Sequence, residues 1–204
     1  MRRVILFVIL GYLSGSVLYA NVFGKIFKKE NMLEESCDHN PGAANAFQYG
    51  GFWCGLLTLC CDLLKGFIPV FLFSRQTPAE GAEFAVAFVL AAPVLGHVFP
   101  AFSRFQGGKG ITTTFGCLLG LVPNGLPSLL LAAFFILFSV VVRISPHFYR
   151  TLAAYFCALL AMPVFGVDPA ICAGFFIITA AVSLRFHLSR EDREDVRVGL
   201  LWMR

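Results

Sequence analysis

Long apolar blocks that are poor in charge constrain the fold of this chain more than any other feature. A membrane-spanning helix needs roughly 20 apolar residues, and the chain has several blocks near that length in place of the periodic stripes of a soluble core. Hydrophobic residues make up 58% of the 204 residues and charged residues only 14%, which argues against a soluble globular domain. The seven blocks are Val4 to Phe23, Phe52 to Phe73, Ala82 to Phe102, Ile111 to Val122, Leu126 to Val142, Thr151 to Phe165 and Pro169 to Phe186.

The fourth block, Ile111 to Val122, is too short to cross a membrane by itself. Its twelve residues end at Pro123, and a helix that rises ~1.5 Å per residue cannot cross about 30 Å of hydrocarbon in that length. We expect a half-helix or a continuation into the next block. The sequence therefore predicts an all-α, polytopic membrane protein with about seven transmembrane helices, built as a single membrane-embedded domain over residues 1–204.

Lysine and arginine residues fall mainly on one side of the predicted membrane. Positive residues are retained in cytoplasmic loops, whereas acidic residues have little effect on orientation. With the amino terminus outside and the carboxyl terminus cytoplasmic, only Arg2, Arg3 and Arg75 lie outside. We expect this orientation, although the Arg2-Arg3 pair by itself favours the reverse. The twelve positive residues on the cytoplasmic side are Lys25, Lys28, Lys29, Arg104, Lys109, Arg143, Arg150, Arg185, Arg190, Arg193, Arg197 and Arg204.

Several polar or small residues inside the apolar blocks need an explanation. Asp62 and Lys65 are three residues apart, on one helix face, where each can neutralise the other. They form either a self-satisfied pair or the polar wall of an internal site. His97, near the end of the third block, either bonds a backbone carbonyl or contributes to function. Gly11 and Gly15 have the GxxxG spacing that favours close helix packing.

The stretch FQGGKGIT, from Phe105 to Thr112, has three glycines around one lysine at the start of an apolar block. Glycine leaves backbone N–H groups accessible, a helix amino terminus adds partial positive charge, and Lys109 adds a full charge. These properties favour a phosphate or carboxylate ligand. Gly110 follows Lys109 where a Walker P-loop has serine or threonine, so nucleotide hydrolysis is disfavoured. At a membrane surface, the stretch predicts a lipid-related substrate or a transported anion.

The loop before the second block contains HNPGAAN, from His39 to Asn45, in which Asn-Pro-Gly predicts a turn. Asn45 is expected to cap a helix or bond a ligand, and an ordinary turn is the alternative.

The seven cysteines lie almost wholly inside the apolar blocks and lack paired CxxC spacing. The sequence therefore predicts neither a metal site nor a disulfide framework.

Four stretches together resemble the bacterial, membrane-embedded glycerol-3-phosphate acyltransferases that use acyl phosphate, the PlsY family. The resemblance covers most of the chain, and it implies a seven-helix fold whose conserved loops face the cytoplasm in the bacterial plasma membrane. The last of the four stretches is the most specific. They are GYLSGSVLYANVFGKIFK (Gly11 to Lys28), HNPGAANAF (His39 to Phe47), DLLKG (Asp62 to Gly66) and LGHVFPAFSRFQGGKGITTTFG (Leu95 to Gly116).

The resemblance implies acyl transfer from acyl phosphate to the 1-hydroxyl of glycerol 3-phosphate, which gives lysophosphatidic acid and phosphate. It implies no cofactor, metal or acyl-enzyme, and acyl phosphate, glycerol 3-phosphate and membrane lipid as partners, without nucleic acid. The expected catalytic residues are Lys109, His187 and Asn45. The expected substrate-binding residues are Asn40, Gly42, Gly107, Gly108, Gly110, His97, Arg193, Asp62 and Lys65. If the enzyme hypothesis is right, Asn45, His97, Lys109 and His187 should converge on one cytoplasm-facing cavity.

The chain also departs from the family pattern at positions that would contact an anion. Asp38, Ala44 and Gln48 stand where serine, threonine and arginine are usual, and Arg190 stands where asparagine is usual. Two alternatives therefore remain. One is an accessory protein that binds a phosphate headgroup without turnover, and the other is a small anion or lipid transporter, which only Asp62, Lys65 and the interrupted fourth block support.

Overall fold

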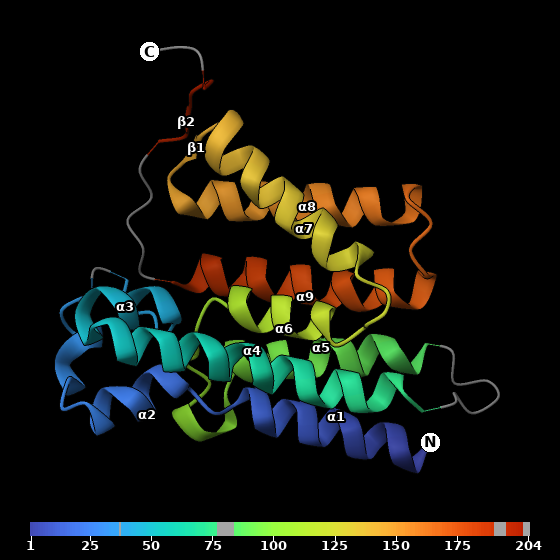
Figure 1. The fold of residues 1–204 in the computed structure, drawn as a ribbon, viewed down its shortest axis with the longest axis horizontal. Coiled ribbons are helices and arrows are strands. Elements are labelled where there is room, and N and C mark those ends of the chain that lie inside the picture. The colour runs from blue at the N-terminus through green and yellow to red at the C-terminus, as the bar shows by residue number, and fades with distance from the viewer. Residues whose placement is uncertain (37, 77–83, 190–194, 202–204) are drawn as a thin grey trace.

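The structure is a computed structural model that describes residues 1–36, 38–76, 84–189 and 195–201. Its main elements are helices, most of which lie side by side in one bundle (Figure 1). The α-helices are α1 (Arg2–Gly15), α2 (Tyr19–Ile26), α3 (Ala43–Gly50), α4 (Phe52–Ser74), α5 (Ala85–Val98), α6 (Ile111–Leu119), α7 (Leu126–Ile136), α8 (His147–Val164) and α9 (Pro169–Leu188). Shorter turns are η1 (Glu30–Leu33), η2 (Ala101–Ser103) and the π-helical η3 (Leu137–Val141).

Three helical segments in the described part of the chain are long and apolar enough to cross a membrane. They are Phe52–Ser74, Ala85–Ser103 and Pro169–Leu188, and α1 with α2 makes a fourth if the bent pair is one span. The protein is thus mostly helical with three or four candidate spans, fewer than the seven blocks of the sequence. The difference arises because several blocks form helices that are short or broken.

The first block is broken where the sequence predicted one continuous span. The axes of α1 and α2 differ by 41°, and Leu18 between them has an extended backbone. The ammonium of Lys65 on α4 donates to the carbonyl of Val17 in this break, over 2.7 Å. The hydroxyl of Ser16 accepts from the backbone N–H of Ala101 over 3.2 Å. The bond from Lys65 satisfies a backbone carbonyl that a continuous helix would pair with a backbone N–H group. The bend is therefore tolerated inside the bundle.

The fourth block forms a half-length helix, one of the two forms expected for it. Helix α6 has 9 residues, from Ile111 to Leu119, and Gly120 to Gly125 separate it from α7. It packs mainly against α4. Its amino end, at Ile111, directly follows Gly107 to Gly110, which are buried inside the bundle, whereas Phe105 and Gln106 before them are exposed.

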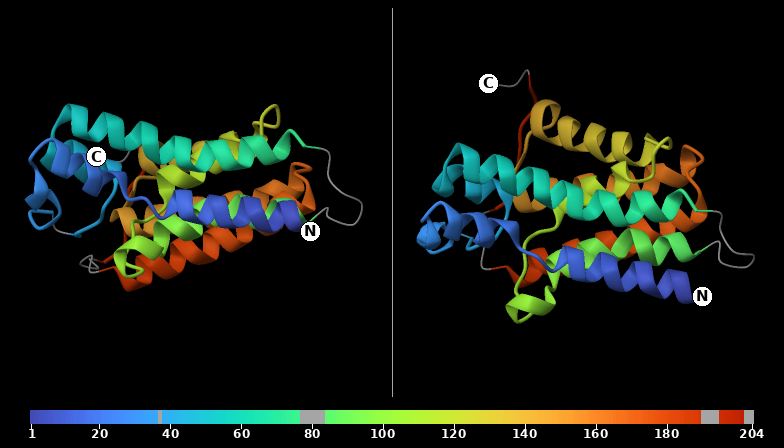
Figure 2. Two further views of the ribbon diagram at one scale, coloured as in Figure 1. Left: turned by 90° about the horizontal axis from the view of Figure 1, so that it is seen from below. Right: turned by 60° about the horizontal axis from the view of Figure 1, so that its bottom comes forward.

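The GxxxG pattern in α1 makes the close helix contact that the sequence predicted. A Cβ atom at Gly15 would lie 2.0 Å from the carbonyl oxygen of Pro93 on α5, so only glycine permits this approach. The right-hand view in Figure 2 shows α1, in blue, running along α5, in green. The hydroxyl of Tyr12 also donates to the carbonyl of Phe99, over 2.7 Å. Helix α1 therefore determines the position of the carboxyl end of α5, where His97 lies.

The main hydrophobic core lies among α5, α6, α7, α8 and α9, and its largest fully buried side chains include Tyr155 and Phe175, whose rings stack. A short antiparallel pairing of β1 (Ile144–Ser145) with β2 (Arg197–Val198) adds a feature that the all-α prediction lacked.

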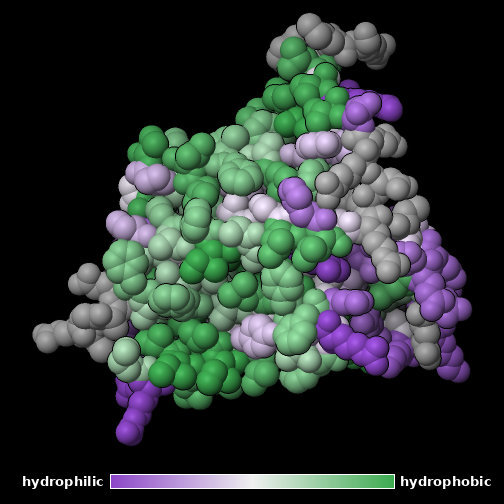
Figure 3. All heavy atoms as spheres, turned by 180° about the vertical axis from the view of Figure 1, so that it is seen from behind, coloured by the Kyte–Doolittle hydropathy of each residue, from purple (hydrophilic) through white to green (hydrophobic). Residues whose placement is uncertain are grey.

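Apolar side chains cover much of the surface in Figure 3, and polar ones gather at the end of the bundle that carries α2 and α3. This distribution is typical of a protein surrounded by lipid.

Candidate functional site

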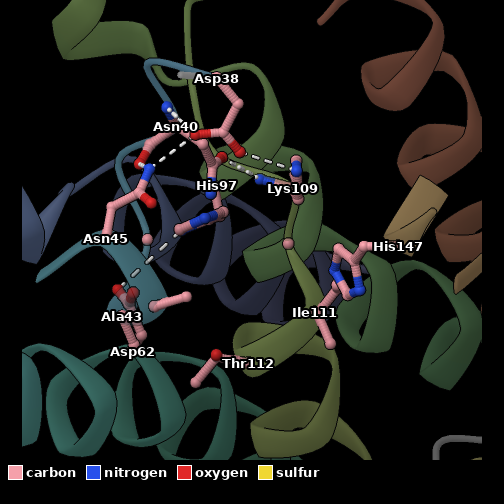
Figure 4. Close-up of a pocket in the computed structure, with 13 residues that line it drawn as sticks. Asp38, Asn40, Ala43, Asn45, Asp62, His97, Lys109, Ile111, Thr112 and His147 are labelled. Carbon is pink, nitrogen blue, oxygen red and sulfur yellow. Dashed lines mark hydrogen bonds and ion pairs between the residues drawn. The ribbon is translucent and has the colours of Figure 1, made fainter. Parts of the chain in front are cut away.

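A cavity of about 230 Å³ joins residues from five separate parts of the chain (Figure 4). Its lining comes from the loop before α3 with the start of α3, from Asp62 on α4, from His97 on α5, from the segment Lys109 to Thr112, and from His147 at the start of α8. Three of the stretches that carry the family resemblance are far apart along the chain, and they therefore meet around one cavity. Within the described residues, no group of three or more His, Cys, Asp or Glu side chains is placed to hold a metal ion.

Two backbone hydrogen bonds hold the Gly108–Lys109 part of the glycine-rich stretch in place. The N–H of Gly108 donates to the carbonyl of His97 over 3.0 Å, and the N–H of Lys109 donates to Oδ1 of Asn40 over 3.0 Å. These two amides are therefore engaged by the protein, whereas the local sequence predicted that they would face a ligand. Gly110, with φ of +83°, turns the chain into α6, and its cavity-lining position brings the helix amino end to the site.

Lys109 is a nearly buried cation in the lining of this cavity. Only 8% of the residue is exposed. Its ammonium lies 2.8 Å from Oδ2 of Asp38 and 5.0 Å from the centre of the Phe186 ring. A carboxylate and an aromatic face both attract a cation, so they hold the Lys109 ammonium at this position. Lys109 is therefore in place to attract a substrate phosphate, provided that the substrate can share it with Asp38.

Asp38 organises the first loop around this ion pair. Its Oδ1 accepts from the side-chain amide of Asn45 over 2.7 Å and from the backbone N–H of Asn40 over 3.2 Å. Burial by itself would raise the pKa of Asp38, but the hydrogen bonds from Lys109 and Asn45 and the charge on Lys109 lower that pKa below its ordinary value of 3.8. Asp38 is therefore a carboxylate at neutral pH, where the family pattern has a neutral serine.

Asn40 and Asn45 connect the first loop to the glycine-rich stretch. Asn45 lies inside α3, whose amino-terminal cap is Gly42, so it does not cap the helix as one reading of the sequence proposed. Its amide donates to the carbonyl of Asn40 over 2.9 Å, and Asn40 in turn accepts from Lys109. The two asparagines thus link α3 to the lysine of the site through the loop between them.

Asp62, Lys65 and His97 form a buried polar group at one side of the cavity. The ammonium of Lys65 lies 2.7 Å from Oδ1 of Asp62 and 2.7 Å from Nδ1 of His97. The i, i+3 spacing therefore does produce the ion pair that the sequence predicted. Asp62 and His97 line the cavity, whereas Lys65 lies behind them and is not part of the lining.

The histidine that the structure brings to the cavity from the carboxyl-terminal half is His147, which sequence reasoning missed. Helix α8 begins at His147, four residues before the predicted block Thr151 to Phe165. Arg150 donates to Nδ1 of His147 over 2.9 Å. Burial, together with the positive charges of Lys109 and Arg150, lowers the pKa of His147 to about 4. A proline directly before an apolar helix, here Pro146, is the sequence signal that could have placed this histidine at a helix start.

The other predicted residues divide between this cavity and its surroundings. Gly42 and Gly110 line it, whereas Gly107 lines a neighbouring cavity of about 650 Å³ that also includes Asp38 and Arg185. Gly108 lies against His97. His187 is exposed, its ring is 5.7 Å from that of Phe148, and it is not among the residues that line either cavity. Arg193, like Arg190, lies outside the described residues.

Residues 5–192 match the family described as glycerol-3-phosphate acyltransferase. The chain belongs to the glycerol-3-phosphate acyltransferase family. Among curated members, the glycerol-3-phosphate acyltransferase of Cupriavidus taiwanensis is 34% identical over 188 residues, which cover 90% of this chain and 88% of that protein. The family match spans the glycine-rich stretch, both asparagines and the buried Asp62, Lys65 and His97.

Two solved structures of the family share the fold. They are crystal structures of PlsY, an integral membrane glycerol 3-phosphate acyltransferase. The glycerol 3-phosphate form gives a TM-score of 0.75 at 26% identity and covers 91% of this chain and 89% of that one. The lysophosphatidic acid form gives 0.72 at 27% identity, covering 90% and 87%. The family resemblance seen in the sequence is therefore confirmed, and the chain is a membrane protein of this family.

Proposed function

We propose that this chain transfers a fatty acyl group from acyl phosphate to the 1-hydroxyl of glycerol 3-phosphate, producing lysophosphatidic acid and phosphate. The observation that carries the proposal is the position of Lys109: a nearly buried ammonium faces a cavity that also contains Asn45, Asp62, His97 and the amino end of α6. An ammonium in this setting is suited to a substrate phosphate group. Membership of the acyltransferase family supports the same reaction.

The proposed reaction needs positioning more than covalent chemistry. The oxygen of the glycerol hydroxyl attacks the acyl carbon, the bond from that carbon to the bridging phosphate oxygen breaks, and a phosphate oxygen takes the hydroxyl proton. Acyl phosphate is already activated, so holding the two substrates together can supply a large part of the rate enhancement. Lys109 stabilises the charge that develops on the departing phosphate. In this scheme, Asn40 and Asn45 hold the first loop in register with Lys109.

Phosphate release tests the proposal directly. Purified protein in lipid nanodiscs is incubated with palmitoyl phosphate, with and without glycerol 3-phosphate, and inorganic phosphate and lysophosphatidic acid are measured. We expect acceptor-dependent release of both products, and a loss of about 100-fold for Lys109→Ala, as for removal of one donor to a developing oxyanion. Lys25→Ala is the matched control, because Lys25 is exposed on α2 and lies away from the cavity.

A folded preparation without acceptor-dependent release contradicts the proposal. Phosphate binding without turnover would then favour the accessory-protein alternative. Acceptor-independent hydrolysis would place the chemistry at this site but contradict glycerol 3-phosphate as the acceptor.

We propose further that the chain crosses the bacterial plasma membrane about seven times, with the amino terminus outside and the carboxyl terminus and the site on the cytoplasmic side. The surface supports this orientation, because polar residues gather at the end of the bundle that carries α2 and its lysines (Figure 3). Single cysteines test it, introduced at Lys28 after α2 and at Gln76 after α4 in a variant that lacks the seven native cysteines. A membrane-impermeant maleimide should label the Gln76→Cys variant in intact cells and the Lys28→Cys variant only after permeabilisation, and the reverse pattern would contradict the orientation.

A further inference from the structure

Three ionisable side chains from α4 and α5 form a continuous chain next to the glycine-rich stretch. Asp62 contacts Lys65, and Lys65 contacts His97, each over 2.7 Å. The side chains of Asp62 and Lys65 are 1% exposed and that of His97 is 4% exposed. Ionisable groups inside membrane segments are costly and usually functional. The geometry of this chain assigns a different part to each of its members.

Lys65 has three N–H donors and three acceptors around it. An ammonium carries three hydrogens and accepts no hydrogen bond. The acceptors are Oδ1 of Asp62, Nδ1 of His97 and the carbonyl of Val17, all at 2.7 Å. Hydrogen bonds to Val17 and His97 and the ion pair with Asp62 therefore engage this ammonium within the chain. Its position behind the cavity lining agrees with this conclusion.

The contact with Lys65 fixes which nitrogen of His97 carries the proton. Because the ammonium can only donate, Nδ1 of His97 must accept, and the neutral ring therefore has its hydrogen on Nε2. Nε2 lies against the glycine-rich stretch: a Cβ atom at Gly108 would be 2.2 Å from it. The imidazole of His97 also lines the cavity that contains Lys109 (Figure 4).

We propose that Lys65 holds His97 in the Nε2–H tautomer, so that His97 donates a hydrogen bond to a phosphate oxygen of the substrate beside Lys109. Asp62 is the counter-ion that keeps Lys65 in place. Lys65 and Asp62 are then positioning residues, and His97 is the one member that touches the substrate. This inference rests on the proposed function. A neutral, fixed donor complements the Lys109 ammonium because it adds directionality without a second full charge in a membrane-buried site.

The proton position on His97 is measured first, independently of turnover. The chain has four histidines, so selective ¹⁵N-histidine labelling with a His97→Gln variant assigns the resonances. Wild type should show a protonated Nε2 and an unprotonated Nδ1 at His97, and Nε2 should shift on titration with glycerol 3-phosphate. The pattern should persist in Lys65→Arg, which still donates, and change to a mixture of tautomers in Asp62→Asn/Lys65→Met. A protonated Nδ1 in the wild type overturns the proposal.

Activity then separates positioning from simple support of the fold. Lys65→Met alone would leave Asp62 buried without its counter-ion and risks unfolding, so the double variant Asp62→Asn/Lys65→Met is the main variant to compare with wild type. We expect it to melt within a few degrees of wild type and to lose about 10- to 100-fold in kcat, as when a group that orients a ligating histidine is removed. Lys65→Arg should recover part of the loss. The control is Thr58→Val, which removes a buried hydroxyl one turn earlier on α4 that donates to the carbonyl of Cys54.

The outcomes distinguish this inference from the proposed function. If the wild type turns over and the folded double variant retains wild-type kcat, the positioning inference is overturned. If His97→Ala retains wild-type kcat, its donor function is overturned. If the wild type itself does not turn over, the proposed function fails, whereas the tautomer pattern and its response to glycerol 3-phosphate still decide the inference about His97 and Lys65.

Discussion

The ammonium of Lys109 and the carboxylate of Asp38 are 2.8 Å apart, so this cation of the cavity lining already has an anionic partner within the chain. A substrate phosphate must share this ammonium with Asp38 or displace Asp38 from it. Because two anions near one cation repel each other, the ion pair is expected to weaken phosphate binding. This relationship is specific to a chain that has aspartate in place of the usual serine.

Replacing Asp38 by asparagine should strengthen phosphate binding. Asparagine keeps the size of the side chain and an oxygen that can accept from Asn45, but it removes the charge that competes for Lys109. We expect the dissociation constant for glycerol 3-phosphate to fall about tenfold, which corresponds to ~1.4 kcal/mol. Isothermal titration calorimetry measures it. Asp195→Asn, at an exposed position, is the control, and weaker binding by the Asp38→Asn variant would show that its charge orders the site and does not compete for Lys109.

The same ion pair should make stability depend on pH in the acid range. The pKa of Asp38 is lowered in the folded protein, so its contribution is complete above the ordinary value near 3.8 and is lost as the pH falls through the lowered value. The melting temperature of the wild type should therefore approach that of Asp38→Asn below about pH 4. Thermal unfolding of both proteins from pH 7 to pH 3 provides the measurement. A constant difference across this range would contradict the assignment.

Alanine at Gly108 should damage the site. The added Cβ would lie 2.2 Å from Nε2 of His97 and 3.1 Å from the carbonyl of Pro41, so either the imidazole or the loop must move. Overpacking of this kind typically destabilises by about 1–3 kcal/mol, and we expect kcat to fall more than tenfold. Gly125→Ala is a matched control because a Cβ there meets no atom within 4 Å. Wild-type activity in Gly108→Ala would show that the close approach of His97 is not needed.

The two histidines of the carboxyl-terminal half should differ in importance. His147 lines the cavity, whereas His187 is exposed and its Nδ1 contacts the carbonyl of Ser183 on its own helix. We expect His147→Ala to lower kcat/KM by about tenfold, the loss typical of one hydrogen bond near a charged substrate, and His187→Ala to have a smaller effect. Initial rates at several glycerol 3-phosphate concentrations compare them. The opposite order would support the sequence-based prediction for His187.

Features that depend on neighbours along the chain could be predicted from the sequence. The Asp62–Lys65 ion pair follows from a helical spacing, the close packing at Gly15 follows from GxxxG, and the half-length α6 follows from Pro123. Each of these rests on local geometry and on the need to satisfy polar groups in lipid. The family resemblance added the reaction and the set of expected site residues.

Features that depend on distant contacts could not be predicted. The break between α1 and α2 is stabilised by Lys65, which is 48 residues from Val17. The pairing of Asp38 with Lys109 needs the folded first loop. The backbone of the glycine-rich stretch is bonded to His97 and Asn40, so its amides are less available than the local sequence suggested. These partners come from other helices, and no spacing rule identifies them.

The contact between α1 and α5 has a practical consequence for producing this protein. A Cβ at Gly96 would lie 2.1 Å from the carbonyl oxygen of Tyr12, and Gly15 approaches Pro93 equally closely from the other side. The first helix is therefore a specific partner of the helix that carries His97, and a generic leader or anchor sequence cannot replace it. Expression vectors that exchange amino-terminal membrane segments should yield inserted but inactive protein unless Gly11 and Gly15 are kept.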